Sequence, residues 1–268
     1  MRGVIFTHTL RRSWLSAVYW GVGVGVIGMF ILLILPNAES LQRFARLLES
    51  MPPALLQAFG ASDVAQLATP EGFIGFGYFT YTMLIMSVYG VVAGLNVTTV
   101  EEDRGILDIL LSAPVSRTQL MIEKGLAYVL LMVLTILVSY LGFVGGKAVS
   151  TLDVDLGKLF VASLNMLPAM LTVFGFSVLV GALARSRATA LALAVAFVIG
   201  SYFIEFIGNA ASQTAVAALR VLSYFSYTGS DTVMTSGLAW GNIVLLIAVG
   251  AVLFVGGAFL FQRRDIGL

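Results

Sequence analysis

Residues 126–146 read LAYVLLMVLTILVSYLGFVGG, a run of 21 residues without a charged side chain. A helix of about 20 such residues crosses the hydrocarbon core of a bilayer, which is ~30 Å thick. Lipid offers the backbone no hydrogen-bond partner, so an isolated apolar segment of this length satisfies its own amides only as a helix. The stretch therefore predicts a transmembrane helix.

Five more apolar segments of similar length lie on either side of this one, at about residues 14–35, 73–97, 159–184, 188–207 and 240–261. Only 11% of the residues are charged and 59% are hydrophobic, whereas a soluble domain carries about 25% charged residues. The first segment is too long for a cleaved signal peptide, and we expect it to be retained. We predict an all-α membrane protein with six transmembrane helices in a single transmembrane domain, residues 1–268.

The basic residues predict how the chain is oriented. Six spans place both termini on one side, and the loops of the cytoplasmic side carry an excess of lysine and arginine. The side of the termini holds ten of the 15 basic residues, namely Arg2, Arg11, Arg12, Arg104, Arg117, Lys124, Arg185, Arg187, Arg263 and Arg264. Both termini are therefore expected in the cytoplasm, in a multi-pass protein of the plasma (inner) membrane.

Three segments outside the spans have amphipathic patterns. Residues 4–12 predict an N-terminal elbow helix at the membrane surface, leading into the first span. Residues 41–51 place apolar side chains on one helical face before two prolines, and residues 216–225 do so around Arg220. We expect these last two segments to form outer interfacial or re-entrant helices, which lie flat or dip into the membrane.

The connection between the second and third spans is more specific. Residues 101–117 read EEDRGILDILLSAPVSR, which predicts an amphipathic helix that stops before Pro114. Ser116 then begins a new helix as its N-cap, with Gln119 at the third position after it. On the residues alone, this segment either rests in the headgroups as a connection or receives force from a docked partner.

This segment resembles the coupling region of membrane subunits of ABC-2 type transporters, in particular the small six-span group. The resemblance rests on the spacing of Glu102, Gly105, Leu107, Asp108, Leu110, Leu111, Ser112, Pro114, Val115, Ser116 and Arg117. Ile106 departs from the usual threonine of the family. The final run with Phe261, Arg263, Arg264 and Asp265 is similar to the end of such subunits.

The resemblance implies a cytoplasmic coupling helix between spans 2 and 3, within residues 101–124, that docks onto an ATPase. The docking residues it implies are Glu101, Glu102, Arg104, Gly105, Leu107, Asp108, Leu110, Leu111, Pro114, Ser116 and Arg117. The implied partners are two copies of a cytoplasmic ATP-binding cassette subunit, a second permease copy or a sister permease, and membrane lipid. Residues 184–187 fit either a second, smaller contact or an ordinary basic anchor, and the anchor is the simpler interpretation.

The sequence lacks the residues that several kinds of chemistry require. The sequence has no phosphate-binding G-x-x-x-x-G-K-[ST] loop, so we expect ATP and Mg²⁺ to be held by the partner and this chain not to be an enzyme. It has no cysteine and one histidine, His8, and we predict no catalytic residue, metal site or nucleic-acid partner. The spans contain almost no ionisable residue; Glu205 fits either an interfacial carboxylate or a proton relay.

The second span supplies a candidate translocation path, formed by Tyr78, Tyr81, Thr82, Met86 and Tyr89. Such a lining suits a lipid-like or amphiphilic cargo, although the same side chains also suit packing between helices. We expect the permease subunit of an ABC-2 type exporter, coupled to ATP hydrolysis by a separate subunit. Two alternatives stay open at this point, an ion-gradient-driven secondary transporter and a non-transporting membrane anchor for an ATPase.

Overall fold

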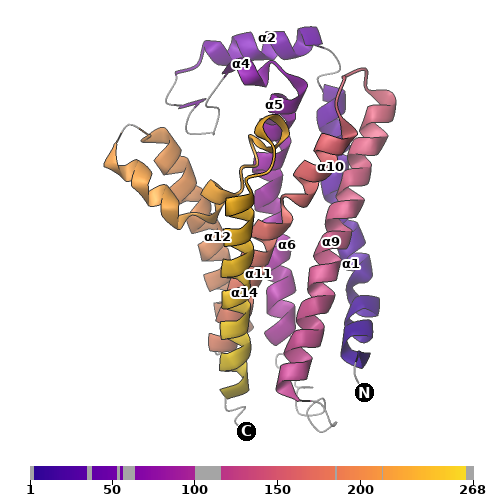
Figure 1. Cartoon of the computed structure of the whole chain (residues 1–268), viewed down its shortest axis with the longest axis vertical. Coiled ribbons are helices and arrows are strands. Elements are labelled where there is room, and N and C mark those ends of the chain that lie inside the picture. The colour runs from indigo at the N-terminus through magenta and orange to yellow at the C-terminus, as the bar shows by residue number, and fades with distance from the viewer. Residues whose placement is uncertain are drawn as a thin grey trace.

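The computed structural model describes residues 3–34, 38–52, 55–56, 64–99, 116–184, 186–212 and 214–263. Within these ranges all regular secondary structure is helical. Figure 1 shows an elongated bundle in which both ends of the chain lie at the same end. We call the end of the bundle that holds both chain termini the terminal end, and the opposite end the far end.

Six helical stretches of the described residues are long and apolar enough to cross a membrane. They are α1 (Val4–Ile34), Pro70–Thr98, α9 (Arg117–Val149), Leu156–Leu183, α12 (Arg187–Ala210) and α14 (Trp240–Arg263). Pro70–Thr98 comprises α5 (Pro70–Ile74), η1 (Gly75–Phe79) and α6 (Thr80–Thr98), and Leu156–Leu183 comprises α10 (Leu156–Leu164) and α11 (Leu167–Leu183). The shorter elements are α2 (Ala38–Glu49), α4 (Val64–Leu67), η2 (Ala215–Leu222), η3 (Tyr224–Tyr227) and α13 (Val233–Ser236).

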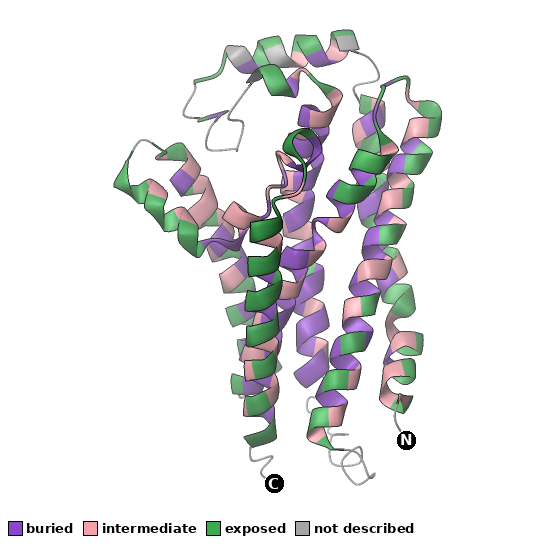
Figure 2. Ribbon diagram, in the orientation of Figure 1, coloured by how far each residue is buried: buried purple, intermediate pink, exposed green. Residues whose placement is uncertain are grey.

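The helices pack as two groups that meet at α6 and α11. Helix α1 runs beside α9, while α11 packs against α14 and α6 (Figure 1). In an 18-residue apolar stretch of each span, the share of buried residues is 72% for Leu156–Leu183 and 67% for Pro70–Thr98. The same share is only 22% for α12 and 17% for α14. Figure 2 shows the same contrast between the purple inner helices and the green surface of α14. The bundle therefore exposes apolar residues outward, as lipid or a partner helix requires.

Helices α1 and α9 approach so closely at Gly25 and Gly142 that a side chain at position 142 is excluded. A Cβ atom on Gly142 would overlap the backbone carbonyl of Gly25. The Thr135 hydroxyl lies 3.2 Å from the Ala17 carbonyl oxygen of α1 and 2.9 Å from the Leu131 carbonyl oxygen of its own helix. In lipid, where apolar surface gives no net drive for helices to associate, such small-residue contacts hold the pair together.

Two spans are not the uninterrupted helices that the hydropathy pattern predicts. The chain breaks at Asn165 and Met166, between α10 and α11. The reason is Pro168, which has no N–H to bond the Leu164 carbonyl and whose ring would clash with it in a continuous helix. Pro168 is instead accommodated in the first turn of the new helix α11. The span that starts at Pro70 contains the π-helical turn η1, a wider turn with one extra residue.

The predicted surface helices have different outcomes. Helix α1 runs from Val4 to Ile34 without a break, so a separate N-terminal elbow helix is not confirmed. Helix α2 lies across the far end (Figure 1), with Leu41 and Leu48 buried beneath it but Leu47 66% exposed. Residues 215–227 form two 3₁₀ helices that turn back toward α6. We call residues 215–227 the returning segment.

The close contact between α1 and α9 gives a test of the fold. Replacing Gly142 by alanine should lower the thermal unfolding midpoint of the purified protein in detergent, because overpacking costs roughly 1–3 kcal/mol. Gly145 on the same helix has nothing within 4 Å of an added Cβ. Gly145→Ala should therefore leave the midpoint unchanged or raise it slightly. Equal effects of the two substitutions would contradict this packing.

Candidate functional site

Helix α9 begins as the sequence predicts. The Ser116 hydroxyl accepts a hydrogen bond from the backbone N–H of Gln119 at 3.1 Å, and the helix starts at Arg117. The Arg117 guanidinium reaches the carbonyl oxygen of Gln262 at 3.4 Å, near the end of α14. The predicted N-cap is thus confirmed, and Arg117 lies at the terminal end, beside the C-terminal helix.

The other predicted docking residues, Glu101, Glu102, Arg104, Gly105, Leu107, Asp108, Leu110, Leu111 and Pro114, lie outside the described residues. The structure describes the helical turns that adjoin this segment on either side. They are the last turn of α6 and the first two turns of α9.

Two adjacent residues of α9 bind the ends of two other helices. Glu123 accepts the backbone N–H of Gly3 at 3.0 Å, and those of Ile5 and Phe6 at 3.1 Å each, which caps the N-terminus of α1. Lys124 donates to the carbonyl oxygens of Asn96 and Val97 at 3.2 and 3.3 Å, near the C-terminus of α6.

The charges suit the helix ends that they meet. A helix N-terminus carries a partial positive charge and unpaired N–H groups, and a C-terminus carries a partial negative charge and unpaired carbonyls. The carboxylate of Glu123 therefore fits α1, and the ammonium of Lys124 fits α6. We call Glu123 and Lys124 the charge pair. It ties three helices together at the terminal end.

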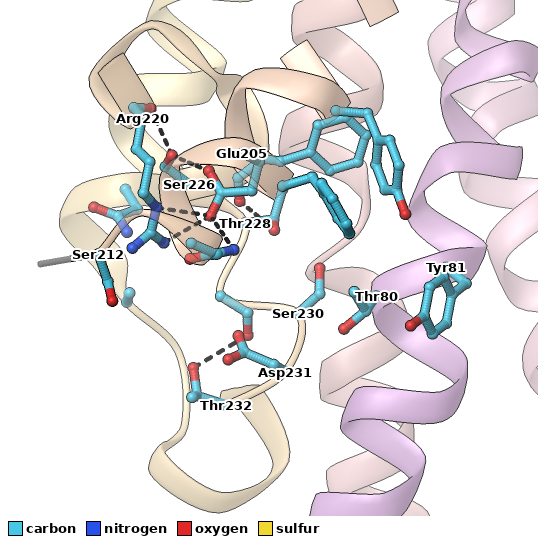
Figure 3. Close-up of a pocket in the computed structure, with 17 residues that line it drawn as sticks. Thr80, Tyr81, Glu205, Ser212, Arg220, Ser226, Thr228, Ser230, Asp231 and Thr232 are labelled. Carbon is cyan, nitrogen blue, oxygen red and sulfur yellow. Dashed lines mark hydrogen bonds and ion pairs between the residues drawn. The ribbon is translucent and has the colours of Figure 1, made fainter. Parts of the chain in front are cut away.

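A second polar group of residues lies toward the far end, around a cavity of about 570 Å³. The cavity is lined by the start of α6, the second half of α12, the returning segment, residues 228–232 and the start of α14. Figure 3 shows Glu205, Arg220 and Ser226 together on one side of it, with Asp231 and Ser230 on another.

Glu205 is the centre of a network within this cavity. Its Oε1 accepts the Nη2 of Arg220 at 2.6 Å, the Nε of Arg220 at 3.0 Å, and the Nδ2 of Asn209 at 3.2 Å. The Ser226 hydroxyl donates to Oε2. Because an arginine pairs with it and each of its hydrogen-bond partners is a donor, Glu205 is held in place as an ion pair between α12 and the returning segment.

The returning segment also reaches the interior of the bundle. The buried hydroxyl of Tyr224 donates to the Ser87 hydroxyl, at 2.8 Å, midway along α6. The Ser223 hydroxyl donates to the backbone carbonyl of Ser201 in α12, also at 2.8 Å. The segment thus contacts the bundle interior through Ser223 and Tyr224, whereas η2 has no buried residue.

The five residues of the candidate translocation path do not share one environment. Tyr78, Thr82 and Met86 are buried within the bundle, where Tyr78 packs edge-on against Phe143 with a centroid distance of 4.6 Å. Tyr81 lines the large cavity. Tyr89 lines a smaller cavity of about 180 Å³ near the terminal end.

The sequence interpretation missed the most connected of these residues. Lys124 and Arg220 entered it only as charges for orientation or as part of a helical face, and Glu123 and Asp231 had no assigned role. A usable signal existed for the charge pair, because adjacent opposite charges at the mouth of a span are expensive to place in lipid without partners. For Arg220 the partner lies 15 residues away across a turn, which no local pattern reveals.

The fold and these groups describe a multi-pass membrane protein with six candidate spans. Residues 5–266 match the family described as ABC-2 family transporter protein. Because the match covers nearly the whole chain, the protein belongs to that family. No curated protein matches the chain.

Membership has two consequences for the chain. The family implies a transmembrane subunit without an ATPase domain. It also implies partnership with an ATP-binding cassette subunit.

The cap on α1 can be tested directly. Glu123→Ala should speed hydrogen exchange of the Ile5 and Phe6 amides, which lose their acceptor, in the purified protein measured by mass spectrometry. Glu39→Ala is the matched control, because Glu39 is an exposed carboxylate that pairs only loosely with Arg43 at 3.8 Å in α2. Exchange in the first turn of α1 that is the same in both variants would show that Glu123 is not its cap.

Proposed function

We propose that this chain is the permease subunit of an ABC-2 type exporter, and that residues 101–117 dock onto a separate ATP-binding cassette subunit. The observation that carries the proposal is the charge pair of α9. It lies within two turns of the proposed docking segment and binds the ends of α1 and α6. A force applied to the start of α9 therefore has a direct, hydrogen-bonded route to two other spans.

The proposal includes an orientation and an assembly. The terminal end faces the cytoplasm of a plasma-membrane protein, in agreement with the excess of basic residues on that side. Two copies of the ATPase subunit bind two permeases, either two copies of this chain or this chain and a sister. ATP and Mg²⁺ bind in the ATPase subunits, whose closure drives alternating access.

The surface of the bundle favours such an assembly. Helices α12 and α14 are mostly exposed and carry large apolar side chains, including Leu193, Phe203 and Val252.

Of the two alternatives, a gradient-driven transporter needs ionisable groups deep within its spans. The ionisable groups discussed above lie instead near the two ends of the bundle, which favours a transporter driven by an external subunit.

The docking proposal is tested by co-purification with the ATP-binding cassette protein encoded nearest to this chain. The wild-type chain should retain the ATPase in detergent. The variant Leu107→Asp/Leu110→Asp should lose it while eluting as a single species, because two carboxylates on the apolar face of the predicted helix cannot be buried at an interface without a large cost.

The control is Leu47→Asp, which makes the same chemical change on an exposed leucine of α2 at the far end. This variant should bind the ATPase as the wild type does. If the Leu107 and Leu110 double variant also binds as well as wild type, residues 101–117 are not the docking site. If no ATPase is retained by any of the chains, the exporter proposal itself fails.

A further inference from the structure

The large cavity holds more negative than positive charge. Its lining includes the carboxylates of Glu205 and Asp231 and one guanidinium, that of Arg220. Arg220 is bound to Glu205 through two nitrogens. None of the ion pairs among the described residues involves Asp231. One carboxylate therefore faces the cavity without a basic side chain as its partner.

Asp231 is held where it is by its neighbours. The Asn165 amide, at the break between α10 and α11, donates to the Thr228 carbonyl at 2.7 Å. Gly229 has a φ of +55°, which a glycine adopts without strain. A Cβ atom on Gly75, in the π-helical turn, would lie 2.5 Å from the Asp231 carbonyl oxygen. The loop that carries Asp231 is thus fixed on two sides before any ligand arrives.

This position is an expensive one for a carboxylate. Burial raises the pKa of Asp231, and the nearby Glu205 carboxylate raises it further. Hydrogen bonds from its own backbone N–H and that of Thr232, together with the charge of Arg220, which makes no ion pair with it, partly oppose this rise. A carboxylate that lacks a basic partner in such a place is stabilised by an incoming cation.

Four aromatic side chains line the cavity, alongside several hydroxyl and amide side chains. They are Tyr81 in the first turn of α6, Tyr202 and Phe206 of α12, and Phe225 of the returning segment. The faces of aromatic rings attract cations, most strongly where water is excluded. The cavity, about 570 Å³, is within the range of 300–1,000 Å³ typical of sites for small organic molecules.

We propose that this cavity binds a lipophilic monovalent cation, with the charge beside the Asp231 carboxylate and the apolar body between the aromatic rings. The carboxylate makes the site select a positively charged ligand. The aromatic rings make it prefer a large organic cation to a hydrated inorganic one. As a statement about cargo, the inference rests on the proposed export function and names its substrate class.

Binding is measured on the full-length chain, purified alone in an uncharged detergent, by equilibrium dialysis with tetraphenylphosphonium. The wild type should bind this cation saturably. Asp231→Asn, which keeps the shape of the side chain and removes its charge, should weaken binding at least about tenfold. Tetraphenylborate has the same size and shape with the opposite charge, and it should show no saturable binding.

The matched control is Asp153→Asn, the same change at an exposed aspartate outside the cavity, beside Lys147. It should bind tetraphenylphosphonium as the wild type does. If Asp231→Asn does not fold, as judged by its elution and thermal unfolding, Tyr81→Leu takes its place and should weaken binding several-fold through the lost ring. Equal affinity of wild type and the folded cavity variant, or equal saturable binding of the borate, overturns the proposal.

The cation-binding experiment and the docking experiment test the two proposals independently. The dialysis uses no ATPase, so a chain that binds the cation through Asp231 but retains no ATPase keeps the cation site and loses the export function. A chain that retains the ATPase but binds the cation no better than Asp231→Asn keeps its place in an exporter and loses the cation site.

Discussion

The structure depends on one constraint, which is that the hydrocarbon core of a membrane contains no water to bond an exposed amide or carbonyl. Each span therefore satisfies its own backbone as a helix. Polar side chains inside the bundle bond to nearby carbonyls for the same reason, as Ser87 does to Met83 at 2.8 Å and Thr172 to Leu246 at 2.9 Å. Helices then associate where small residues let their backbones meet, as Gly25 and Gly142 do.

The same constraint explains where the irregular parts of the chain lie. The break at Asn165 and the π-helical turn at Gly75 both leave backbone groups outside the regular helical pattern. Both lie beside residues 228–232, whose own backbone accepts the Asn165 amide and packs on Gly75. These two departures from regular helix thus lie in one polar region, where hydrogen bonds and a cavity accommodate them.

Much of the fold could be predicted from the sequence, because the length of an apolar run is a local property. The six spans, the N-cap at Ser116 and the amphipathic helix over α2 follow from residues close to each other in the chain. The break before Pro168 also had a local signal, which the strong hydropathy of the segment concealed. The π-helical turn had none, since no residue type within residues 75–79 demands it.

The candidate sites were harder to predict, because their partners are far apart in sequence. Glu123 bonds to a helix about 118 residues away, and Tyr224 reaches Ser87 across 137 positions. A single sequence does not indicate which of its distant residues contact each other. The sequence interpretation of Glu205 left open an interfacial carboxylate and a proton relay. The structure places this residue in an ion pair with Arg220.

The charge pair has a geometric consequence. Neighbouring residues of an α-helix project about 100° apart around its axis, so Glu123 and Lys124 grip α1 and α6 on different sides of α9. If α9 rotated about its own axis, the attached ends of α1 and α6 would move in different directions, because they are bound on different sides of α9. The first turns of α9 would in this way convert a torque into a change of spacing between α1 and α6, and so into a change of width at the mouth of the bundle.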